Sequence, residues 1–238
     1  MLPIADENVP GRSFPIVTIA LIVINALVFV LLQLPNDAFT YGFSAIPREI
    51  TTGVDLVNPV RQGGVPIPQA PGPEPIYLTL LSSMFMHGGW LHLIGNMLFL
   101  YIFGDNVEHA VGSLVYLAFY VVAGVVASLA QIFLSPDSAI PSLGASGAIS
   151  GVLAAYLVLF PGNRVLVVFF YAAFWVPALV AIGLWAVLQF IGGLGQIAMT
   201  EQTGGVAYAA HIGGFVVGLA FGVIARGFAR IPRAYGRR

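Results

Sequence analysis

The stretch SLGASGAISGVLAAYLVLF, residues 142–160, joins a long apolar run to a hydroxyl at its start. Its periodicity and the following Pro161 predict a helix that begins at Ser146 and ends 15 residues later. At 1.5 Å per residue this helix spans about 22 Å, whereas the hydrocarbon core of a bilayer is about 30 Å thick. We therefore expect a short membrane helix that starts below one face of the bilayer, with Ser146 at the submerged end.

The rest of the chain also has the composition of a membrane protein. Of its 238 residues, 58% are hydrophobic and 8% are charged, against roughly 25% charged residues in a soluble domain. The chain is expected to be polytopic and surrounded by the lipid bilayer. A net charge of −1 argues against nucleic acid as a partner. The lack of cysteine excludes disulfides, thiol nucleophiles and thiolate metal sites.

Six apolar segments predict an all-α fold, a polytopic bundle of six transmembrane helices. The first segment lacks the cleavage site of a secretory signal, so we expect it to be retained. Residues 1–13 precede the bundle, 14–226 form it, and 227–238 make a basic tail. Residues 35–75 are rich in proline and glycine and predict a long extramembrane loop. The expected helices are 14–34, 90–104, 114–134, 146–160, 165–191 and 206–225, the second preceded by an apolar lead-in over 76–86.

The basic residues, all nine of them arginines, predict the orientation of the bundle. With both termini in the cytoplasm, seven arginines lie inside and two, Arg48 and Arg61, lie outside, in accord with the positive-inside rule. We expect an integral protein of the plasma (inner) membrane, with its N- and C-terminal segments in the cytoplasm. The seven are Arg12, Arg164, Arg226, Arg230, Arg233, Arg237 and Arg238.

Four polar residues from three predicted helices fall at one depth. Ser146 and His211 each lie 15 residues, or about 22 Å, from the inner end of their helix. His92 and Asn96 lie about 20 and 14 Å above the inner end of theirs. These side chains therefore share a layer in the outer half of the membrane, and a site built from them faces the outer side.

Small residues recur every four positions on two of the helices, a spacing that permits close backbone approach in lipid. Ser146 and His211 flank these stripes, so a hydrogen bond between them is expected. Two prolines interrupt the segment before Ser146, and irregular backbone at membrane depth needs protein or water around it; we expect a water-filled pocket there. The stripes are Gly147, Gly151 and Ala155 on one helix and Ala210, Gly214, Gly218 and Gly222 on the other.

Ser146 and His211 together suggest nucleophilic catalysis. A lone serine in such a helix is most often a packing residue, but an intramembrane histidine usually faces a cavity or a relay. Serine becomes a nucleophile when a base lies within hydrogen-bond reach, and a helix start favours a developing anion. No Asp or Glu lies at this depth, so we expect a dyad and no triad.

Further polar residues lie in or near the second helix. His92 and Asn96 are one turn apart and share a face, where they could donate hydrogen bonds to an oxyanion or, alternatively, join helices in the bundle. His87 is expected to order the turn before this helix. Asp105 and Glu108 are expected as solvated charges at its inner end, although Glu108 could tie it to a neighbour.

No metal or cofactor is expected. The chain has four histidines, but His92 and Asn96 offer one good ligand at their spacing, and the layer holds no carboxylate. The His-Glu-x-x-His pattern of intramembrane zinc proteases does not occur.

Three ordered motifs resemble the rhomboid family of intramembrane serine proteases. They are HGGWLHLIGNMLFL (87–100), GASGAISG (144–151) and AHIGGFVVG (210–218), in the family's order of HxxxN, GxSG and AHxxGxxxG. The resemblance covers about residues 75–222. It implies Ser146 as nucleophile, His211 as general base, and His92, Asn96 and the backbone N–H of Ser146 as the oxyanion hole. It also implies close backbone approach at Gly144 and Gly147 beside the nucleophile.

The resemblance implies substrates too: single-pass membrane proteins, cleaved in or near their transmembrane segments. Two departures stand out. Many members carry a Trp-Arg pair in the first loop, where this chain reads IYLTLL (76–81); this bears on the anchoring of the loop. Some members place a tyrosine four residues after the nucleophile, stacked on the catalytic histidine, where this chain has Ser150; this bears on the support of His211.

Two other functions stay open at this point. A non-catalytic rhomboid-like protein would bind transmembrane clients, and its function would survive Ser146→Ala. A small transporter would use the polar layer as a transport site, but internal repeats are typical of transporters, and the glycine-rich halves of this chain do not match in order.

Overall fold

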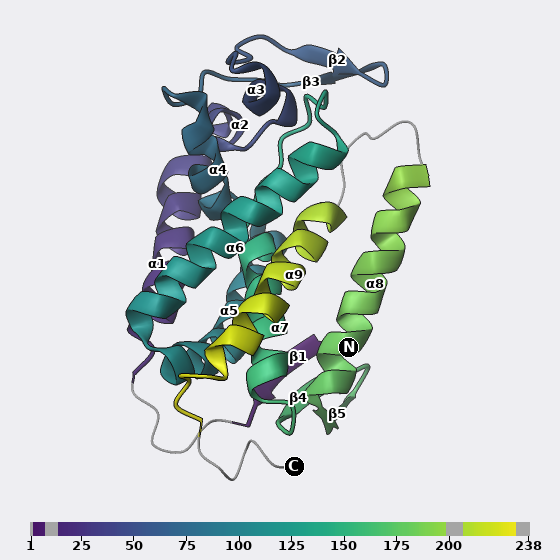
Figure 1. The fold of residues 1–238 in the computed structure, drawn as a ribbon. Coiled ribbons are helices and arrows are strands. Elements are labelled where there is room, and N and C mark those ends of the chain that lie inside the picture. The colour runs from purple at the N-terminus through teal and green to yellow at the C-terminus, as the bar shows by residue number, and fades with distance from the viewer. Residues whose placement is uncertain (1, 8–13, 199–206, 232–238) are drawn as a thin grey trace.

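The computed structural model describes residues 2–7, 14–198 and 207–231 of the chain (Figure 1). Within these ranges, six long helices account for most of the molecule, and the prediction of a largely helical membrane protein is confirmed. The long helices are α1 (Ile16–Val28, continued by a π-helical turn, Phe29–Gln33), α5 (Trp90–Val111), α6 (Ser113–Leu134), α7 (Ser146–Leu159), α8 (Ala178–Ala198) and α9 (Tyr208–Ala225).

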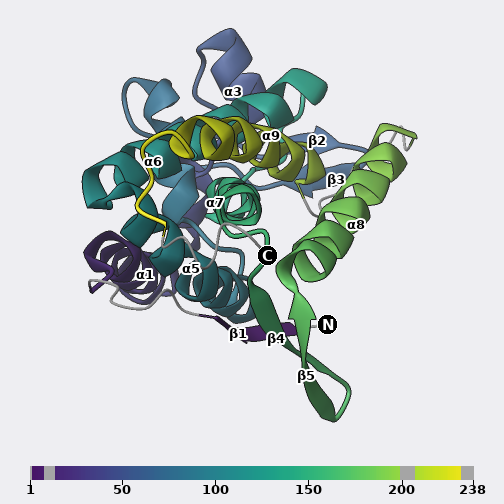
Figure 2. The same ribbon diagram turned by 60° about the horizontal axis from the view of Figure 1, so that its bottom comes forward.

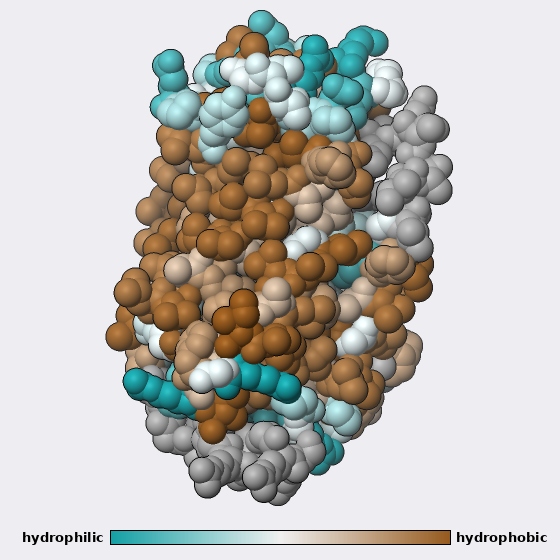
Figure 3. Space-filling view, in the orientation of Figure 1, coloured by the Kyte–Doolittle hydropathy of each residue, from teal (hydrophilic) through white to brown (hydrophobic). Residues whose placement is uncertain are grey.

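Apolar residues form a broad band around the middle of the visible face, and polar residues gather at its two ends (Figure 3). Three helical segments among the described residues are long and apolar enough to cross a membrane: Ile16–Gln33, Ser113–Leu134 and Tyr208–Ala225. The apolar helices Ser146–Leu159 and Ala178–Gly193 are shorter. Three of the six expected spans therefore meet the requirements of length and hydropathy together among the described residues, and α7 is as short as its sequence predicts.

Helix α7 lies at the centre of the bundle, with α5, α6 and α9 around it (Figure 2). Its residues from Gly147 to Tyr156 are all buried, as expected for a helix that is apolar on every side. The stripes of small residues lie at its contact with α9. A Cβ atom at Gly214 would collide with the carbonyl oxygen of Gly147, and one at Gly218 with that of Gly151. The two backbones thus touch directly.

One expected helix is wrong in part. The sequence predicts a single span over residues 165–191, but a β-hairpin, β4 (Arg164–Phe169) and β5 (Ala172–Pro177), precedes α8. Trp175 and Pro177, which fall within the range of that expected helix, therefore lie in β5, whereas Trp185 is helical. The stretch is rich in valine and aromatic residues, which favour strands, and hydropathy alone does not separate an apolar strand from an apolar helix.

The hairpin belongs to a three-stranded antiparallel sheet of order β1-β4-β5, in which β1 is Leu2–Asp6. The sequence predicts residues 1–13 only as a short segment before the bundle. The buried carboxylate of Asp6 accepts hydrogen bonds from Asn106 Nδ2 (2.6 Å) and the Tyr156 hydroxyl (2.7 Å). These contacts fasten β1 to the lower ends of α5 and α7. Four of the arginines counted for orientation, Arg12, Arg233, Arg237 and Arg238, and most of the tail 227–238 lie outside the described residues.

The expected charges at the end of α5 are not solvated. Asp105 and Glu108 are 7% and 3% exposed. The Glu108 carboxylate accepts hydrogen bonds from the backbone N–H groups of Val17 and Thr18 at 2.9 and 2.8 Å, and from the hydroxyls of Thr18 and Ser113 at 2.8 and 2.6 Å. It satisfies the first N–H groups of α1, which would otherwise lack partners. Glu108 therefore ties α1, α5 and α6 together.

Residues 35–75, here called the outer cap, cover the opposite end of the bundle from the sheet (Figure 1). The cap contains α2 (Asp37–Phe43), α3 (Pro47–Thr52) and the hairpin β2–β3 (Val60–Gln62 and Val65–Ile67), and it is followed by α4 (Thr79–Ser82) between two 3-10 turns, Ile76–Leu78 and Ser83–Phe85. It is anchored without a Trp-Arg pair. Ala45 and Ser142 exchange two backbone hydrogen bonds, and Arg48 N–H donates to Ser138 O. The cap therefore holds the segment that leads into Ser146.

Candidate active site

Ser146 is the first residue of α7, and the turn before it depends on glycine. Gly144 has a φ of +123°, a conformation that L side chains rarely adopt. A Cβ atom there would lie 2.8 Å from His92 Nε2. The Gly144 N–H donates to Ser83 O at 2.9 Å, which fixes the turn to the segment before α5. Gly144 thus lets α5 approach the start of α7 closely.

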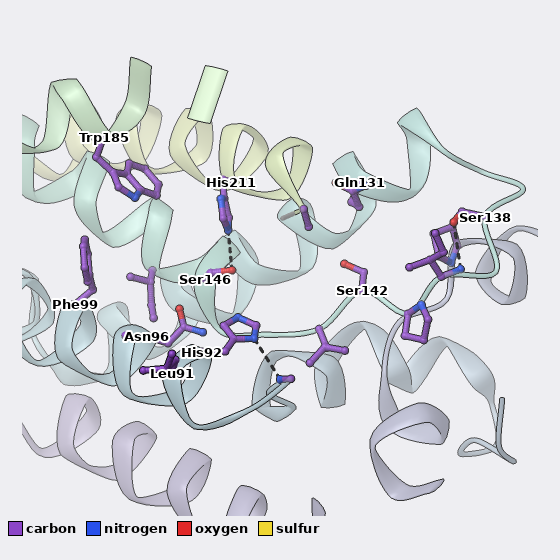
Figure 4. Close-up of a pocket in the computed structure, with 18 residues that line it drawn as sticks. Leu91, His92, Asn96, Phe99, Gln131, Ser138, Ser142, Ser146, Trp185 and His211 are labelled. Carbon is purple, nitrogen blue, oxygen red and sulfur yellow. Dashed lines mark hydrogen bonds between the residues drawn. The ribbon is translucent and has the colours of Figure 1, made fainter. Parts of the chain in front are cut away.

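His211 lies in the first turn of α9 and faces Ser146 (Figure 4). Its Nε2 atom is 2.8 Å from Ser146 Oγ, and the histidine is 8% exposed. The close contact of α7 with α9 brings the two ends together, as the glycine stripes predict. The hydroxyl and imidazole therefore meet in hydrogen-bonding geometry across a helix interface.

The other face of His211 contacts α8. Its Nδ1 atom lies 2.7 Å from Gln189 Oε1, and the ring of Trp185 lies 5.9 Å away, centroid to centroid, at an angle of 39°. With the amide in this orientation its oxygen accepts, which corresponds to the tautomer that has the proton on Nδ1 and the lone pair of Nε2 facing Ser146. Sequence reasoning missed Gln189 because it looked only for a carboxylate. The signal was there: Gln189 is a polar residue one turn after Trp185 in an apolar segment.

Ser150 supports the same histidine from α7. Its hydroxyl, fully buried, donates to the backbone carbonyl of His211 at 2.6 Å. The sequence identified Ser150 only as a departure from a stacked tyrosine. In the structure, Ser150 contacts the main chain of His211, and an aromatic ring, Trp185, comes from α8.

His92 and Asn96 both have hydrogen-bond donors beside the Ser146 turn. The Gly88 N–H donates to His92 Nδ1 at 3.2 Å, which leaves the proton on Nε2, the atom that faces Gly144. Asn96 Nδ2 is buried and has no hydrogen-bond partner in the part of the chain that the structure describes. Buried donors are seldom left unpaired. The two groups are therefore available to donate hydrogen bonds to an acceptor beside Ser146.

His87 holds the turn before α5 through its backbone. Its N–H donates to Gln33 Oε1 at 2.9 Å, and Gln33 Nε2 donates to its carbonyl at 3.0 Å. The His87 ring is 2% exposed and packs edge-on against His92, with centroids 5.1 Å apart. The ring thus contacts His92 but is not part of the cavity lining at Ser146, and a structural role for His87 stays a prediction.

A cavity of about 510 Å³ is lined by Ser146, His211, His92 and Asn96. It lies between α5, α6, α7, α8 and α9, and it reaches the segment held by the outer cap, so a pocket lies where the irregular backbone before α7 predicts one (Figure 4). Across the described ranges, no group of three or more His, Asp or Glu is placed to hold a metal ion. The lining residues that carry polar side chains are His92, Asn96, Gln131, Ser138, Ser142, Ser146 and His211, with Trp185 beside them.

The sequence of this chain is similar to those of known proteins. The model of the rhomboid domain matches residues 75–228. Rhomboid protein 1, mitochondrial, of Saccharomyces cerevisiae is 30% identical over 149 residues, which cover 61% of this chain and 41% of that protein. Rhomboid protease GluP of Bacillus subtilis is 42% identical over 85 residues, 36% of this chain and 16% of GluP.

One similar protein is named as inactive. Inactive rhomboid protein 1 of Drosophila melanogaster is 31% identical over 121 residues, 51% of this chain and 8% of that protein. In all three pairs the match spans less than half of the relative. Overall similarity therefore does not separate an active from an inactive protein, and the residues at the site have to be compared with the chemistry.

Proposed function

Since the chain belongs to the rhomboid family, we propose that it is an intramembrane serine endopeptidase that uses a Ser146–His211 dyad. The observation that carries this proposal is the 2.8 Å contact between His211 Nε2 and Ser146 Oγ at a cavity with free hydrogen-bond donors. Family membership alone does not separate a protease from an inactive member. The retained hydroxyl and imidazole, in reactive geometry, favour the protease.

The proposed reaction is acyl transfer through two tetrahedral intermediates. Ser146 Oγ attacks the scissile carbonyl carbon while His211 Nε2 takes its proton. The carbonyl oxygen becomes an oxyanion, and His92 Nε2–H, Asn96 Nδ2 and the Ser146 backbone N–H donate to it. His211 then returns the proton to the leaving amine, the C–N bond breaks, and an acyl-enzyme forms. Water attacks this ester with His211 again as base, which releases the acid and restores Ser146.

The proposed substrates are single-pass membrane proteins cleaved in or near their transmembrane segments. A helical peptide bond hides its carbonyl in the backbone hydrogen-bond ladder, so the substrate has to unwind locally before Ser146 can attack. The cavity lies at the capped end of the bundle, on the side opposite the sheet and both described chain ends. We place these chain ends in the cytoplasm and the active site toward the outer side of the plasma (inner) membrane.

The alternative is a rhomboid-like protein that binds transmembrane clients without cutting them, a possibility raised by the similar protein that is named inactive. Binding of clients does not require a hydroxyl paired with a base, and it does not require unpaired donors at His92 and Asn96. Acyl transfer requires both the nucleophile and the donors.

Labelling by a fluorophosphonate probe tests the proposal. The purified full chain is expected to form a covalent adduct at Ser146, located by mass spectrometry of its peptides. Ser146→Ala removes the attacked oxygen and should abolish the adduct. His211→Ala should slow labelling by at least about 100-fold, the scale of general-base catalysis. A wild-type chain that stays unlabelled, or an adduct that persists in Ser146→Ala, would remove the nucleophile from the proposal.

A further inference from the structure

Helix α8 supplies two side chains to His211. Gln189 Oε1 lies 2.7 Å from Nδ1, and the Trp185 ring lies 5.9 Å from the imidazole. Gln189 and Trp185 are four residues apart and therefore share one face of α8. Trp185 also packs against Phe215 of α9, with ring centroids 6.3 Å apart. One face of α8 thus covers the side of His211 that points away from Ser146.

In the amide orientation that the structure shows, Gln189 favours the tautomer of His211 that carries its proton on Nδ1. A neutral imidazole has one N–H and one lone pair, and the hydrogen bond at one nitrogen sets the state of the other. In the opposite tautomer an N–H would face Ser146, and the Gln189 amide would have to turn over so that its Nε2 donates to Nδ1. That arrangement loses the Oε1 contact that the structure shows and offers Ser146 no base.

Among the described residues, Gln189 is the hydrogen-bond partner of His211 Nδ1. Within the ranges that the structure describes, the titratable group that bears on the ring from a neighbouring element is His92 of α5, and it lies on the Ser146 side. Ser150 contacts only the backbone of His211. The ring orientation therefore depends on α8.

We propose that Gln189 is a positioning residue that holds His211 in the tautomer and orientation needed to take the Ser146 proton. This inference rests on the proposed protease function and deepens it, because it adds a third, uncharged member to the dyad. It also makes the base depend on the placement of α8. When α8 lies against α9 the carbonyl reaches Nδ1, and a displacement beyond hydrogen-bond reach leaves His211 free to change tautomer.

A plainer role for Gln189 would be to satisfy its own polar group within an apolar helix. The two roles differ in what they affect. A purely structural hydrogen bond changes stability and leaves the rate of acylation intact in whatever protein is folded. A positioning bond changes the rate of the chemical step and leaves binding of the probe unchanged.

Three variants of the full chain separate these roles in the fluorophosphonate assay. Gln189→Met keeps nearly the same shape and length but removes the acceptor. Gln189→Glu keeps an acceptor oxygen at the same distance. Leu188→Ala, the matched control, changes an exposed neighbour on α8. For each, the maximal labelling rate and the probe concentration at half-maximal rate are measured separately, together with the melting temperature.

We expect Gln189→Met to lower the maximal labelling rate by about 10-fold, the effect of one hydrogen bond, with the half-saturating probe concentration unchanged. Gln189→Glu should stay within about 3-fold of wild type, and Leu188→Ala should match it. A wild-type rate in Gln189→Met overturns the inference while Ser146 labelling still upholds the protease. A loss of about 10-fold in Gln189→Glu, which keeps the acceptor, also overturns it, and this arm decides if Gln189→Met fails to fold. Absence of wild-type labelling overturns the protease function, and this inference with it.

Discussion

Helices α7 and α8 both hold His211, but they are attached to the bundle in different ways. Helix α7 is buried from Gly147 to Tyr156 and touches the backbone of α9 at two glycines, Gly214 and Gly218. Helix α8 stands at the side of the bundle (Figure 2) and exposes much of its apolar surface. Its large exposed residues are Leu179, Val180, Leu184, Val187, Leu188, Phe190 and Ile191.

The difference divides the support of His211 into two parts. Helix α7 binds the main chain of the histidine through Ser150, and α8 binds its ring through Gln189. Packing of backbone against backbone leaves no room for adjustment. Helix α8 meets α9 through α9 side chains that pack on its glycines, as Tyr208 does at Gly192, and a side chain can move more easily than a backbone. The rigid contact with α7 thus sets the position of the His211 main chain, and the more exposed helix α8 sets the protonation of its ring.

The largest effect should come from filling a glycine in the rigid interface. In Gly218→Val the new side chain would overlap the carbonyl of Gly151, and two backbones would have to separate. Overpacking of a core costs about 1–3 kcal/mol even where side chains can yield, so we expect a loss of at least about 3 kcal/mol and no labelling of Ser146. Thermal unfolding in detergent measures the first, and the probe measures the second.

Gly183→Ala on α8 is the matched control. A Cβ atom there meets nothing within 4 Å, and alanine is the better helix former by about 1 kcal/mol. We expect an unchanged or higher melting temperature and wild-type labelling. If Gly183→Ala were as harmful as Gly218→Val, the two helices would not differ in the way their contacts indicate.

A smaller effect is expected from Ser150→Ala, which removes the α7 contact to the main chain of His211. Loss of one buried hydrogen bond costs about 1 kcal/mol. The melting temperature should fall, whereas the maximal labelling rate should change by less than about 3-fold, because Gln189 still holds the ring. Gln189→Met is expected to show the reverse pattern. A drop in rate larger in Ser150→Ala than in Gln189→Met would mean that α7, and not α8, sets the state of the base.

The sequence predicted those parts of the site that depend on distance along a helix. Ser146 and His211 lie equally far from the inner ends of their helices, and the glycine stripes lie beside them, so residue spacing alone predicts the proximity that the structure shows; their common depth in the membrane stays a prediction. Regular geometry converts such counts into positions. His92 and Asn96, four residues apart, followed in the same way.

Features that depend on what an apolar residue packs against were not predictable. The hairpin 164–177 is strongly hydrophobic, and hydropathy alone does not separate it from a membrane helix. Its β4 strand also pairs with β1, more than 150 residues away in sequence, which the residues of the hairpin do not reveal. The contacts of Gln189 and Ser150 with His211 span 22 and 61 residues. Their polarity could be seen in the sequence, but not the atom that each one faces.

The outer cap offers a third kind of attachment, one that depends on pH. Glu49 of α3 is 1% exposed, accepts a hydrogen bond from Leu56 N–H at 2.8 Å, and has Asp55 nearby. Burial raises the pKa of Glu49 to about 7; the Leu56 hydrogen bond opposes this shift, and the Asp55 charge adds to it. Arg48, beside it, donates from its backbone to Ser138, a residue that lines the cavity.

The smallest expected effect is therefore a loosening of the cap at alkaline pH. Between about pH 4.5 and 7 the folded state keeps a proton on Glu49 that the unfolded chain releases, so the stability of the cap falls as the pH rises through this range and then levels off. Hydrogen exchange over residues 45–56, corrected for its intrinsic pH dependence, should show less protection at pH 8 than at pH 5.5, with α7 unaffected. Gln cannot ionise, so Glu49→Gln should remove the difference between the two pH values. If the difference survives in Glu49→Gln, another group titrates in the cap, and the hold on Ser138 does not depend on the Glu49 proton.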